Sequence, residues 1–262
     1  MVHINKGLCI GCGNCVKDCL AGNIIVKDQK AQILGNCILC GHCVAICPSG
    51  AVTIPEYDMT DVEDVSSASH LDPKELLHSI KFRRSIRDYQ DRPVEQLKLE
   101  TILQAGRYTA TAKNNQNCCF IFIQKELSTL KHLVWDYIDR VTNQEAASLP
   151  PNLMPYVDFN RRRKENPADD FLFRNAPVVL FITSDWPLDA GLAAQNIENM
   201  TIALGLGALY NGYLCRICDT NEELKNWLGI KDQTIKACLL LGYPNRSYHR
   251  SAPRKPANVI WK

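Results

Sequence analysis

Two short runs of cysteine constrain this chain more than any other feature. Eight of the 13 cysteines fall between residues 9 and 47, and the next one is Cys118. Both runs have the spacing C-x2-C-x2-C-x3-C, and their members are Cys9, Cys12, Cys15 and Cys19, then Cys37, Cys40, Cys43 and Cys47. A segment of roughly 56 residues buries too little apolar surface to fold unaided, and small domains of this size often fold around metal. Residues 1–56 are therefore expected to form a metal-dependent domain.

The remaining composition narrows the class of protein. The 262 residues are 46% hydrophobic and carry a formal net charge of +2, which favours a packed fold and gives no support to a nucleic-acid partner. No run approaches the roughly 18 apolar residues of a membrane span. The first residues, MVHINKGLCIGC, lack the apolar stretch of a secretory signal. We therefore expect a cytoplasmic protein whose cysteines serve metal or redox chemistry before disulfides.

The cysteine spacing predicts two [4Fe–4S] clusters. In this pattern the first three thiolates of a run lie on one tight loop, and the fourth binds the cluster of the other run. Cluster I would be held by Cys9, Cys12, Cys15 and Cys47, and cluster II by Cys19, Cys37, Cys40 and Cys43. Gly11, Gly13 and Gly41 would let backbone N–H groups approach the sulfur atoms. Two zinc sites are the alternative, but zinc ligands usually form two C-x2-C pairs separated by about a dozen residues or more.

Residues 1–56 thus resemble a two-cluster bacterial ferredoxin. One departure is Leu20, which stands where a proline often follows the first run, whereas Pro48 follows the second. The resemblance implies low-potential one-electron transfer between two clusters.

The pattern changes after an acidic, serine-rich segment at residues 57–72, which contains no Lys or Arg and is expected to be a linker. A helix should start at Pro73, with Asp72 as its N-cap, and end at the segment RRSIR. Further helices are expected at 96–110, 127–141, 189–206 and 222–228, buried strands at 118–124, 177–183 and 237–241, and a long mobile connection at 150–170. This alternation predicts that residues 73–262 form an α+β domain with helices covering a central sheet.

The segment RRSIR combines three guanidinium groups and a hydroxyl, at Arg83, Arg84, Ser85 and Arg87. Such a set can bind a dianion such as a phosphate. A solvated basic helix end is the plainer alternative. Taken alone, the segment favours that alternative.

Three further segments follow it in a fixed order: TATAKNNQ at 109–116, AAQNIENMTIALGLGALYNG at 193–212 and LGYPNRSYHRSAPRK at 241–255. Together with RRSIRDYQDRPV, they resemble the nitroreductase family over about residues 73–262. The first segment matches the family's R-x-S-x-[RK]. The second departs from P-S-x-x-N-x-Q, since Ala110 and Thr111 replace Pro and Ser, and Asn117-Cys118 replaces a frequent Pro-Trp.

The resemblance implies an FMN-binding homodimer with a flavin site at each interface. Arg83, Ser85 and Arg254 would hold the FMN phosphate, with Arg84 and Lys255 beside them, and Arg87 would lie near the flavin N1/O2 edge. Thr111, Asn114 and Gln116 would bind the flavin or its ribityl chain from the second subunit. Gly205, Gly207 and Gly212 would belong to the segment that passes the flavin N5, although Gly205 and Gly207 could also form a helix C-cap. No dinucleotide fingerprint is present, because Tyr210 stands where a third glycine would be.

The expected function is that of an iron–sulfur flavoprotein oxidoreductase, which passes electrons from the clusters to FMN and on to a small organic acceptor: a nitro-aromatic, a quinone, an enone or a flavin. The external donor would be a ferredoxin or NAD(P)H. One alternative is an NAD(P)H-driven flavin enzyme with the clusters as an outlet. Another is a non-catalytic electron carrier or redox sensor.

Other polar features are interpreted as structural. Cys215 and Cys218 are expected to be buried thiols, and Cys118, Cys119 and Cys238 to lie on core strands. His42 is assigned no ligand role, because its run already has four thiolates. The basic run 161–164 is expected to be a solvated face in preference to a docking site for an acidic electron carrier.

Overall fold

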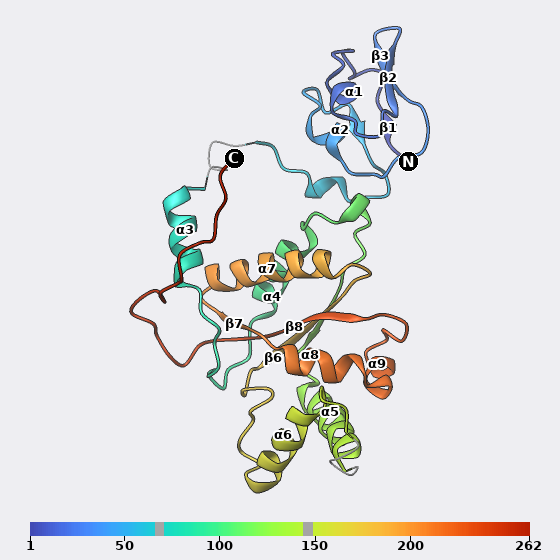
Figure 1. The fold of residues 1–262 in the computed structure, drawn as a ribbon. Coiled ribbons are helices and arrows are strands. Elements are labelled where there is room, and N and C mark those ends of the chain that lie inside the picture. The colour runs from blue at the N-terminus through green and yellow to red at the C-terminus, as the bar shows by residue number, and fades with distance from the viewer. Residues whose placement is uncertain (66–70, 144–148) are drawn as a thin grey trace. The chain divides into compact units, whose positions relative to one another are not determined.

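The chain forms two compact units, and the computed structural model describes residues 1–65, 71–143 and 149–262 (Figure 1). The cysteine unit comprises residues 1–71 together with 111–115, and the sheet unit comprises 72–110 and 116–262. Within the expected linker, residues 66–70 lie outside the described part. The preceding stretch contains a 3-10 turn at Met59–Asp61, capped by the Asp58 carboxylate, which accepts from the Thr60 N–H.

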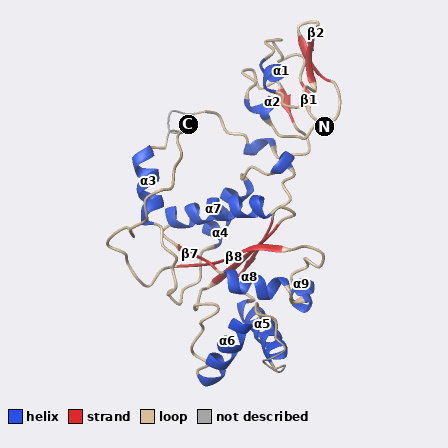
Figure 2. Cartoon of the chain, in the orientation of Figure 1, coloured by secondary structure: helices blue, strands red, loops and turns tan. Residues whose placement is uncertain are grey.

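The cysteine unit is built from short elements that mirror the sequence repeat (Figure 2). Each cysteine run leads into one short helix, and both helices follow a glycine with φ 76°, Gly13 and Gly41. The elements are β1 (His3–Ile4), α1 (Asn14–Asp18), β2 (Ile24–Lys27), β3 (Lys30–Ile33), α2 (His42–Ala45) and β4 (Val52–Thr53), with a 3-10 turn at Ala112–Asn114. Strand β1 pairs with β4, and β2 with β3, both antiparallel.

The β2–β3 hairpin lies against the first cysteine run. Its two-residue turn places Asp28 and Gln29 at φ 50° and 57°, the type I′ geometry that suits the twist of a hairpin. A Cβ on Gly11 would lie 2.3 Å from the Gln29 carbonyl oxygen, and Gly11 itself has φ +71°. Only glycine meets both conditions, so this close approach fixes the hairpin beside the loop that carries Cys9 and Cys12.

The sheet unit confirms the predicted α+β class. Its four-stranded sheet has the order β5-β6-β8-β7 and is antiparallel throughout. The strands are β5 (Cys119–Ile123), β6 (Val178–Thr183), β7 (Gly207–Tyr210) and β8 (Ile235–Gly242). The helices are α3 (Pro73–Phe82), α4 (Gln96–Arg107), α5 (Leu127–Thr142), α6 (Met154–Glu165), α7 (Pro187–Ala203), α8 (Gly212–Asp219) and α9 (Glu222–Trp227).

Two hydrophobic cores lie on opposite faces of this sheet. Along β6, Val178, Leu180 and Ile182 enter the core shared with α4 and α7. Val179 and Phe181 enter the core shared with α5, α6 and α8. Side chains on a strand alternate between faces, so a strand covered on both faces is apolar throughout. Figure 1 shows α7 and α4 on one side of the sheet and α5, α6 and α8 on the other.

Three features of the sheet unit differ from the sequence expectations. The connection expected at 150–170 contains helix α6, because Tyr156 and Phe159 are buried one turn apart and Pro155 falls in the first turn, where proline is tolerated. Strand β7 and helix α8 were not expected. Helix α3 ends at Phe82, so RRSIR is not on a helix. Within the described ranges, no helix is long and apolar enough to cross a membrane.

We predict that Gly242→Ala destabilises the sheet unit by about 1–3 kcal/mol, the usual range for overpacking a tight core. The added Cβ would lie 2.5 Å from Pro177 Cδ and 2.9 Å from Tyr89 Cδ1, and both belong to rings that cannot rotate away. Denaturant unfolding followed by tryptophan fluorescence measures this change, since all four tryptophans lie in the sheet unit.

The matched control is Gly191→Ala, in the exposed part of α7. A Cβ there meets no atom within 4 Å, so the variant should be as stable as the parent or up to about 1 kcal/mol more stable. Equal unfolding midpoints for the two variants would contradict the packing argument.

Candidate functional site

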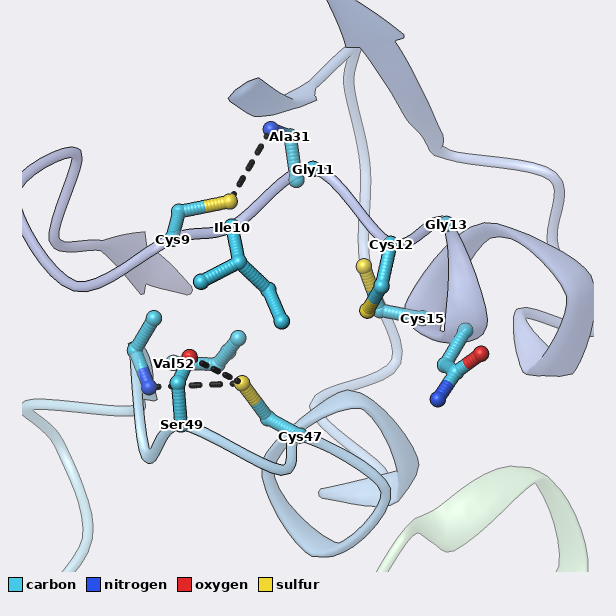
Figure 3. Close-up of a pocket in the computed structure, with 12 residues that line it drawn as sticks. Cys9, Ile10, Gly11, Cys12, Gly13, Cys15, Ala31, Cys47, Ser49 and Val52 are labelled. Atoms are coloured by element: carbon cyan, nitrogen blue, oxygen red, sulfur yellow. Dashed lines mark hydrogen bonds between the residues drawn. The ribbon is translucent and has the colours of Figure 1, made fainter. Parts of the chain in front are cut away.

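The cysteine unit contains a cavity lined by sulfur from both runs. Cys9, Cys12 and Cys15 of the first run and Cys47 of the second surround it (Figure 3). Cys9 and Cys15 are buried, Cys47 is half-buried and Cys12 is exposed. The structure therefore gathers the four residues expected to hold cluster I. Because Cys47 lies 28 positions beyond Cys19, the run's own fourth cysteine, sequence proximity alone does not produce this set.

Hydrogen-bond donors face two of these sulfur atoms. The Ala31 N–H, from β3, lies 3.4 Å from Cys9 Sγ, and the Ala51 N–H lies 3.3 Å from Cys47 Sγ. The Ser49 hydroxyl is 3.7 Å from Cys47 Sγ. The Lys30 ammonium group also donates to the Cys9 carbonyl oxygen at 2.5 Å. Donors and a cation around sulfur stabilise thiolates and the negative charge of an iron–sulfur cluster.

The pKa values of these thiols follow their surroundings. Burial raises the pKa of Cys15, and the neighbouring Cys12, Cys47 and Cys9 raise it further. Burial opposes ionisation of Cys47 as well, but the Ser49 hydroxyl and nearby backbone N–H groups outweigh it and lower the pKa of that thiol. In the described ranges, no set of three or more His, Cys, Asp or Glu side chains is arranged to hold a single metal ion. The donor set around the cavity fits a [4Fe–4S] cluster.

The second set of cysteines has fewer donors. Burial, followed by the neighbouring Cys37 and Cys40, raises the pKa of Cys43 to about 11. Cys37 Sγ accepts from the Leu39 N–H at 3.3 Å. Leu39 has φ 52°, at the position where the first run has Gly11. Cys19, the expected fourth ligand, directly follows α1 and packs against the same small core.

The segment TATAKNNQ, which is expected to bind flavin, divides between the two units. Thr111 and Asn114 group with the cysteine unit, and Gln116 with the sheet unit. The Asn114 amide donates to the Ile38 and Leu39 carbonyl oxygens, each at 3.0 Å. This amide therefore fixes the loop between Cys37 and Cys40, a contact that the sequence did not predict.

In the sheet unit, RRSIR forms an extended segment beside strand β7. Ser85 bridges to Ala208 in the parallel sense, and the Ile86 N–H donates to the Ala208 carbonyl at 3.0 Å. Ile86 is buried. Arg83, Ser85 and Arg87 stand at alternate positions of this segment, around the buried Ile86. The result is a row of cation, hydroxyl and cation along the sheet edge.

Arg83 pairs with a carboxylate that the sequence analysis missed. Its guanidinium donates to Glu198 Oε1 at 3.1 Å, and the Glu198 side chain is 2% exposed. A buried carboxylate needs such a partner, so Glu198 fixes where Arg83 points. The guanidinium carries five N–H donors, and one carboxylate leaves several for an anion. The neighbouring Arg84 donates to the Arg250 carbonyl at 3.3 Å, four residues before Arg254.

Arg87 lies near a second cation, Arg174, which the sequence also did not indicate. Burial lowers the pKa of Arg174, and Arg87 and then Arg162 lower it further. The Arg174 guanidinium packs 3.9 Å from the Phe171 ring centre. Among the described residues, Arg87 has no hydrogen-bond or carboxylate partner. Two neighbouring guanidinium groups, of which Arg87 lacks a carboxylate partner, favour the binding of an anion between them.

The glycines of the third segment have separate structural roles. Gly205 follows Leu204, the C-cap residue of helix α7, and its φ of 74° is the left-handed conformation that commonly ends a helix. A Cβ on Gly207 would lie 2.3 Å from Ile86 Cγ1, so this glycine permits the contact between RRSIR and β7. Gly212 begins α8 immediately after the buried Asn211, whose amide donates to the Leu172 carbonyl at 2.6 Å and whose oxygen caps Leu214. At the chain end, Arg254 and Lys255 are exposed.

The remaining sequence interpretations have mixed outcomes. Cys218 and Cys238 are buried, whereas Cys215, Cys118 and Cys119 are half-buried. His42 is exposed and contacts the Asp18 carboxylate at 3.0 Å. Of the basic run, Arg161 pairs with Asp158 and Glu165, and Arg162 and Lys164 each pair with an aspartate. These internal pairs leave little uncompensated charge for docking.

Comparison with known proteins gives the same two parts. The nitroreductase family matches residues 80–243, and a 4Fe-4S dicluster domain matches residues 8–52. A protein of Methanothermobacter thermautotrophicus, provisionally named an NADH dehydrogenase/NAD(P)H nitroreductase, is 27% identical over 189 residues, which cover 67% of this chain and 82% of that protein.

Two solved structures share the fold of the sheet unit. A nitroreductase from Bacteroides fragilis with bound FMN has a TM-score of 0.58 at 19% identity, over 72% of this chain and 99% of that one. A nitroreductase from Desulfitobacterium hafniense, also with bound FMN, has a TM-score of 0.56 at 21% identity, over 71% and 98%. Since the family match spans more than half of its length, this chain belongs to the nitroreductase family, as an oxidoreductase joined to a 4Fe–4S domain.

Proposed function

We propose that this chain is an iron–sulfur flavoprotein oxidoreductase with two [4Fe–4S] clusters in the cysteine unit, FMN in the sheet unit and a small organic acceptor as substrate. The observation that carries the proposal is the cavity in which Cys47 joins Cys9, Cys12 and Cys15. A shared cavity of this kind is what the interleaved ligation of two clusters requires. Joined to a member of the nitroreductase family, it supplies single electrons to an enzyme that reduces organic compounds.

The cluster ligands are proposed as the spacing predicts them. Cys9, Cys12, Cys15 and Cys47 would hold cluster I, and Cys19, Cys37, Cys40 and Cys43 cluster II. When bound, the clusters supply one-electron transfer. Thiolate ligation needs a reducing compartment, which supports a cytoplasmic location.

The FMN site is proposed on the row of Arg83, Ser85 and Arg87. Arg83 and Ser85 would hold the phosphate, and Arg87 with Arg174 would place positive charge near the flavin ring. Arg84, Arg254 and Lys255 would add cations near the phosphate, and the peptide groups from Gly205 to Gly212 would line the ring. Thr111, Asn114 and Gln116 remain proposed contacts from a second subunit. When bound, FMN supplies the redox chemistry, and these residues position it and stabilise its negative charge.

We predict that Arg87→Ala weakens FMN binding by about one to two factors of ten, since a charge-assisted hydrogen bond contributes about 1.5–3 kcal/mol. Arg87 is exposed and has no carboxylate partner in the described structure, so its loss should leave the fold unchanged. Fluorescence titration of the apoprotein with FMN measures the affinity. Arg140→Ala, which removes an exposed arginine paired with Glu223, is the matched control and should bind FMN as the parent does.

Arg83 needs a paired design. Arg83→Ala alone would leave the Glu198 carboxylate buried without a partner, which would destabilise the fold. Arg83→Ala combined with Glu198→Gln removes the cation without leaving a buried charge, and it should lower FMN affinity by a similar factor. FMN binding at parental strength by both Arg87→Ala and this double variant would refute the proposed site.

NAD(P)H as electron donor is a second candidate, favoured by the name of the archaeal relative. No dinucleotide-binding motif follows a strand in this chain, so a nicotinamide would have to approach the flavin directly. The clusters would then act as an outlet for electrons.

We predict that reduced ferredoxin bleaches both the flavin and the iron–sulfur absorption of the anaerobic protein faster than NADH or NADPH does. Stopped-flow absorption with each donor, followed by a screen of nitro-aromatic, quinone and enone acceptors, measures this. Faster reduction by a nicotinamide would establish the second candidate. Reduction without turnover of any acceptor would favour a carrier or sensor.

A homodimer is proposed because one copy leaves apolar surface exposed. Helix α3 has no buried residue, and its Leu77 and Ile80 are 51% and 49% exposed. Ile260 and Trp261 near the chain end are 82% and 91% exposed. Burial of such surface drives association. Sedimentation equilibrium of the full chain should therefore give twice the 29.5 kDa of one copy, and a mass of one copy would exclude the dimer.

A further inference from the structure

The two cysteine loops differ in the groups that face their sulfur atoms. Around the first set, the Ala31 and Ala51 N–H groups and the Ser49 hydroxyl face sulfur. Around the second, the described residues provide one such contact, from the Leu39 N–H to Cys37 Sγ. Figure 3 shows the Ala31–Cys9 interaction on one side of the cavity and the Ser49–Cys47 interaction on the other.

The nearby charges differ in the same direction. The Lys30 ammonium group is bonded to the Cys9 carbonyl oxygen, in the loop of the first set. Beside the second set lies the Asp18 carboxylate, which precedes Cys19 and, with Cys40 and His42, lines an open surface depression. This carboxylate contacts the His42 ring at 3.0 Å. Exposure differs less between the sets, because Cys12 and Cys40 are both exposed and Cys15 and Cys43 are both buried.

Alignment of the two cysteine runs identifies one side chain that contributes to this difference in hydrogen-bond donors. Cys47-Pro48-Ser49-Gly50 in the second run corresponds to Cys19-Leu20-Ala21-Gly22 in the first. Both turns have the same backbone, since Gly50 and Gly22 have φ 61° and 62° and each donates its N–H to the cysteine carbonyl three residues earlier. Position 49 therefore places a hydroxyl beside Cys47, whereas position 21 places only a methyl group near Cys19.

We propose that cluster I has the higher reduction potential, that the first electron to enter the cysteine unit resides on it, and that Ser49 is a residue that sets this order. The inference rests on the proposed function, because it requires both clusters. Adding one electron to a cluster makes it more negative. Donors and cations stabilise that charge and raise the potential, and a carboxylate lowers it. Ser49 acts through Cys47, because its hydroxyl lies beside the Cys47 sulfur and would stabilise the added negative charge there.

The test measures the two potentials on the full chain, purified without oxygen. Stepwise reduction with dithionite is followed by electron paramagnetic resonance, which detects each reduced cluster. The parent should show two waves in which cluster I is occupied at least tenfold over cluster II after the first electron, a separation of about 59 mV or more. Two waves at the same potential would overturn the proposal.

Reciprocal variants assign the waves. Ser49→Ala should lower the potential of the upper wave and leave the potential of the lower wave unchanged. Ser49→Thr, which keeps a hydroxyl at this position, should have the upper potential of the parent. Ala21→Ser adds the missing hydroxyl at the equivalent turn and should shift the lower wave upwards. The double variant with Ser49→Ala and Ala21→Ser should narrow or reverse the separation. If Ser49→Ala moves the lower wave, or if neither wave responds to any variant, the assignment is wrong.

The content of iron and acid-labile sulfide per chain distinguishes a failure of this inference from a failure of the proposed function. About eight of each per chain are expected for two clusters. A content of about four would remove the two-cluster proposal, and this inference with it. A content of eight with unresolved potentials would overturn the inference alone. Should Ser49→Ala fail to retain iron, Ala21→Ser and Ser49→Thr still test it, because neither removes a donor.

Discussion

The cysteine unit depends on one exchange between its two halves, in which Cys47 joins the loop that carries Cys9, Cys12 and Cys15. Its strands are two to four residues long and its helices four and five, too short to hold the unit together by themselves. The exchange links residues almost 40 positions apart in the sequence. The hairpin that approaches Gly11, the donors on Ala31 and Ala51, and the turn at Ser49 are all positioned by it. Neither half of the repeat alone supplies the four cysteines that line the cavity.

The sheet unit is stabilised in a different way, by burying strand β6 on both faces. Its alternate side chains serve two separate cores, so β6 and β8 form the rigid centre from which β7 extends towards one edge. The segment from Arg83 to Arg87 pairs with that edge because Gly207 leaves room for Ile86. Arg83, Ser85 and Arg87 therefore lie along a sheet edge. The two cores that hold the sheet, rather than the segment itself, fix where the backbone of these residues lies.

Sequence patterns predicted those parts of the molecule that have a recognisable residue spacing or helix cap. Cysteine spacing predicted the set around the cavity, and Asp72 with Pro73 predicted the start of α3. Strand β7 was missed, since Gly207–Tyr210 is short and directly follows the C-cap of α7. Helix α6 was missed because the prolines in and around it are typical of a loop, and the burial of Tyr156 and Phe159 against the core stabilises the helix. Glu198 and Arg174 could not be found from sequence, because each acquires its role from a partner far along the chain.

Leu39 has a consequence for how well each cysteine loop is shaped before any cluster is bound. It occupies the left-handed region at φ 52°, where the first run has Gly11. A side chain there costs about 1–2 kcal/mol that glycine does not. The Asn114 amide, bonded on the carbonyl side of the same residue, helps to hold this conformation. Before metal is bound, the second loop is therefore less pre-shaped than the first. If both loops hold clusters as proposed, this difference in backbone strain would favour assembly of a cluster in the first loop before the second.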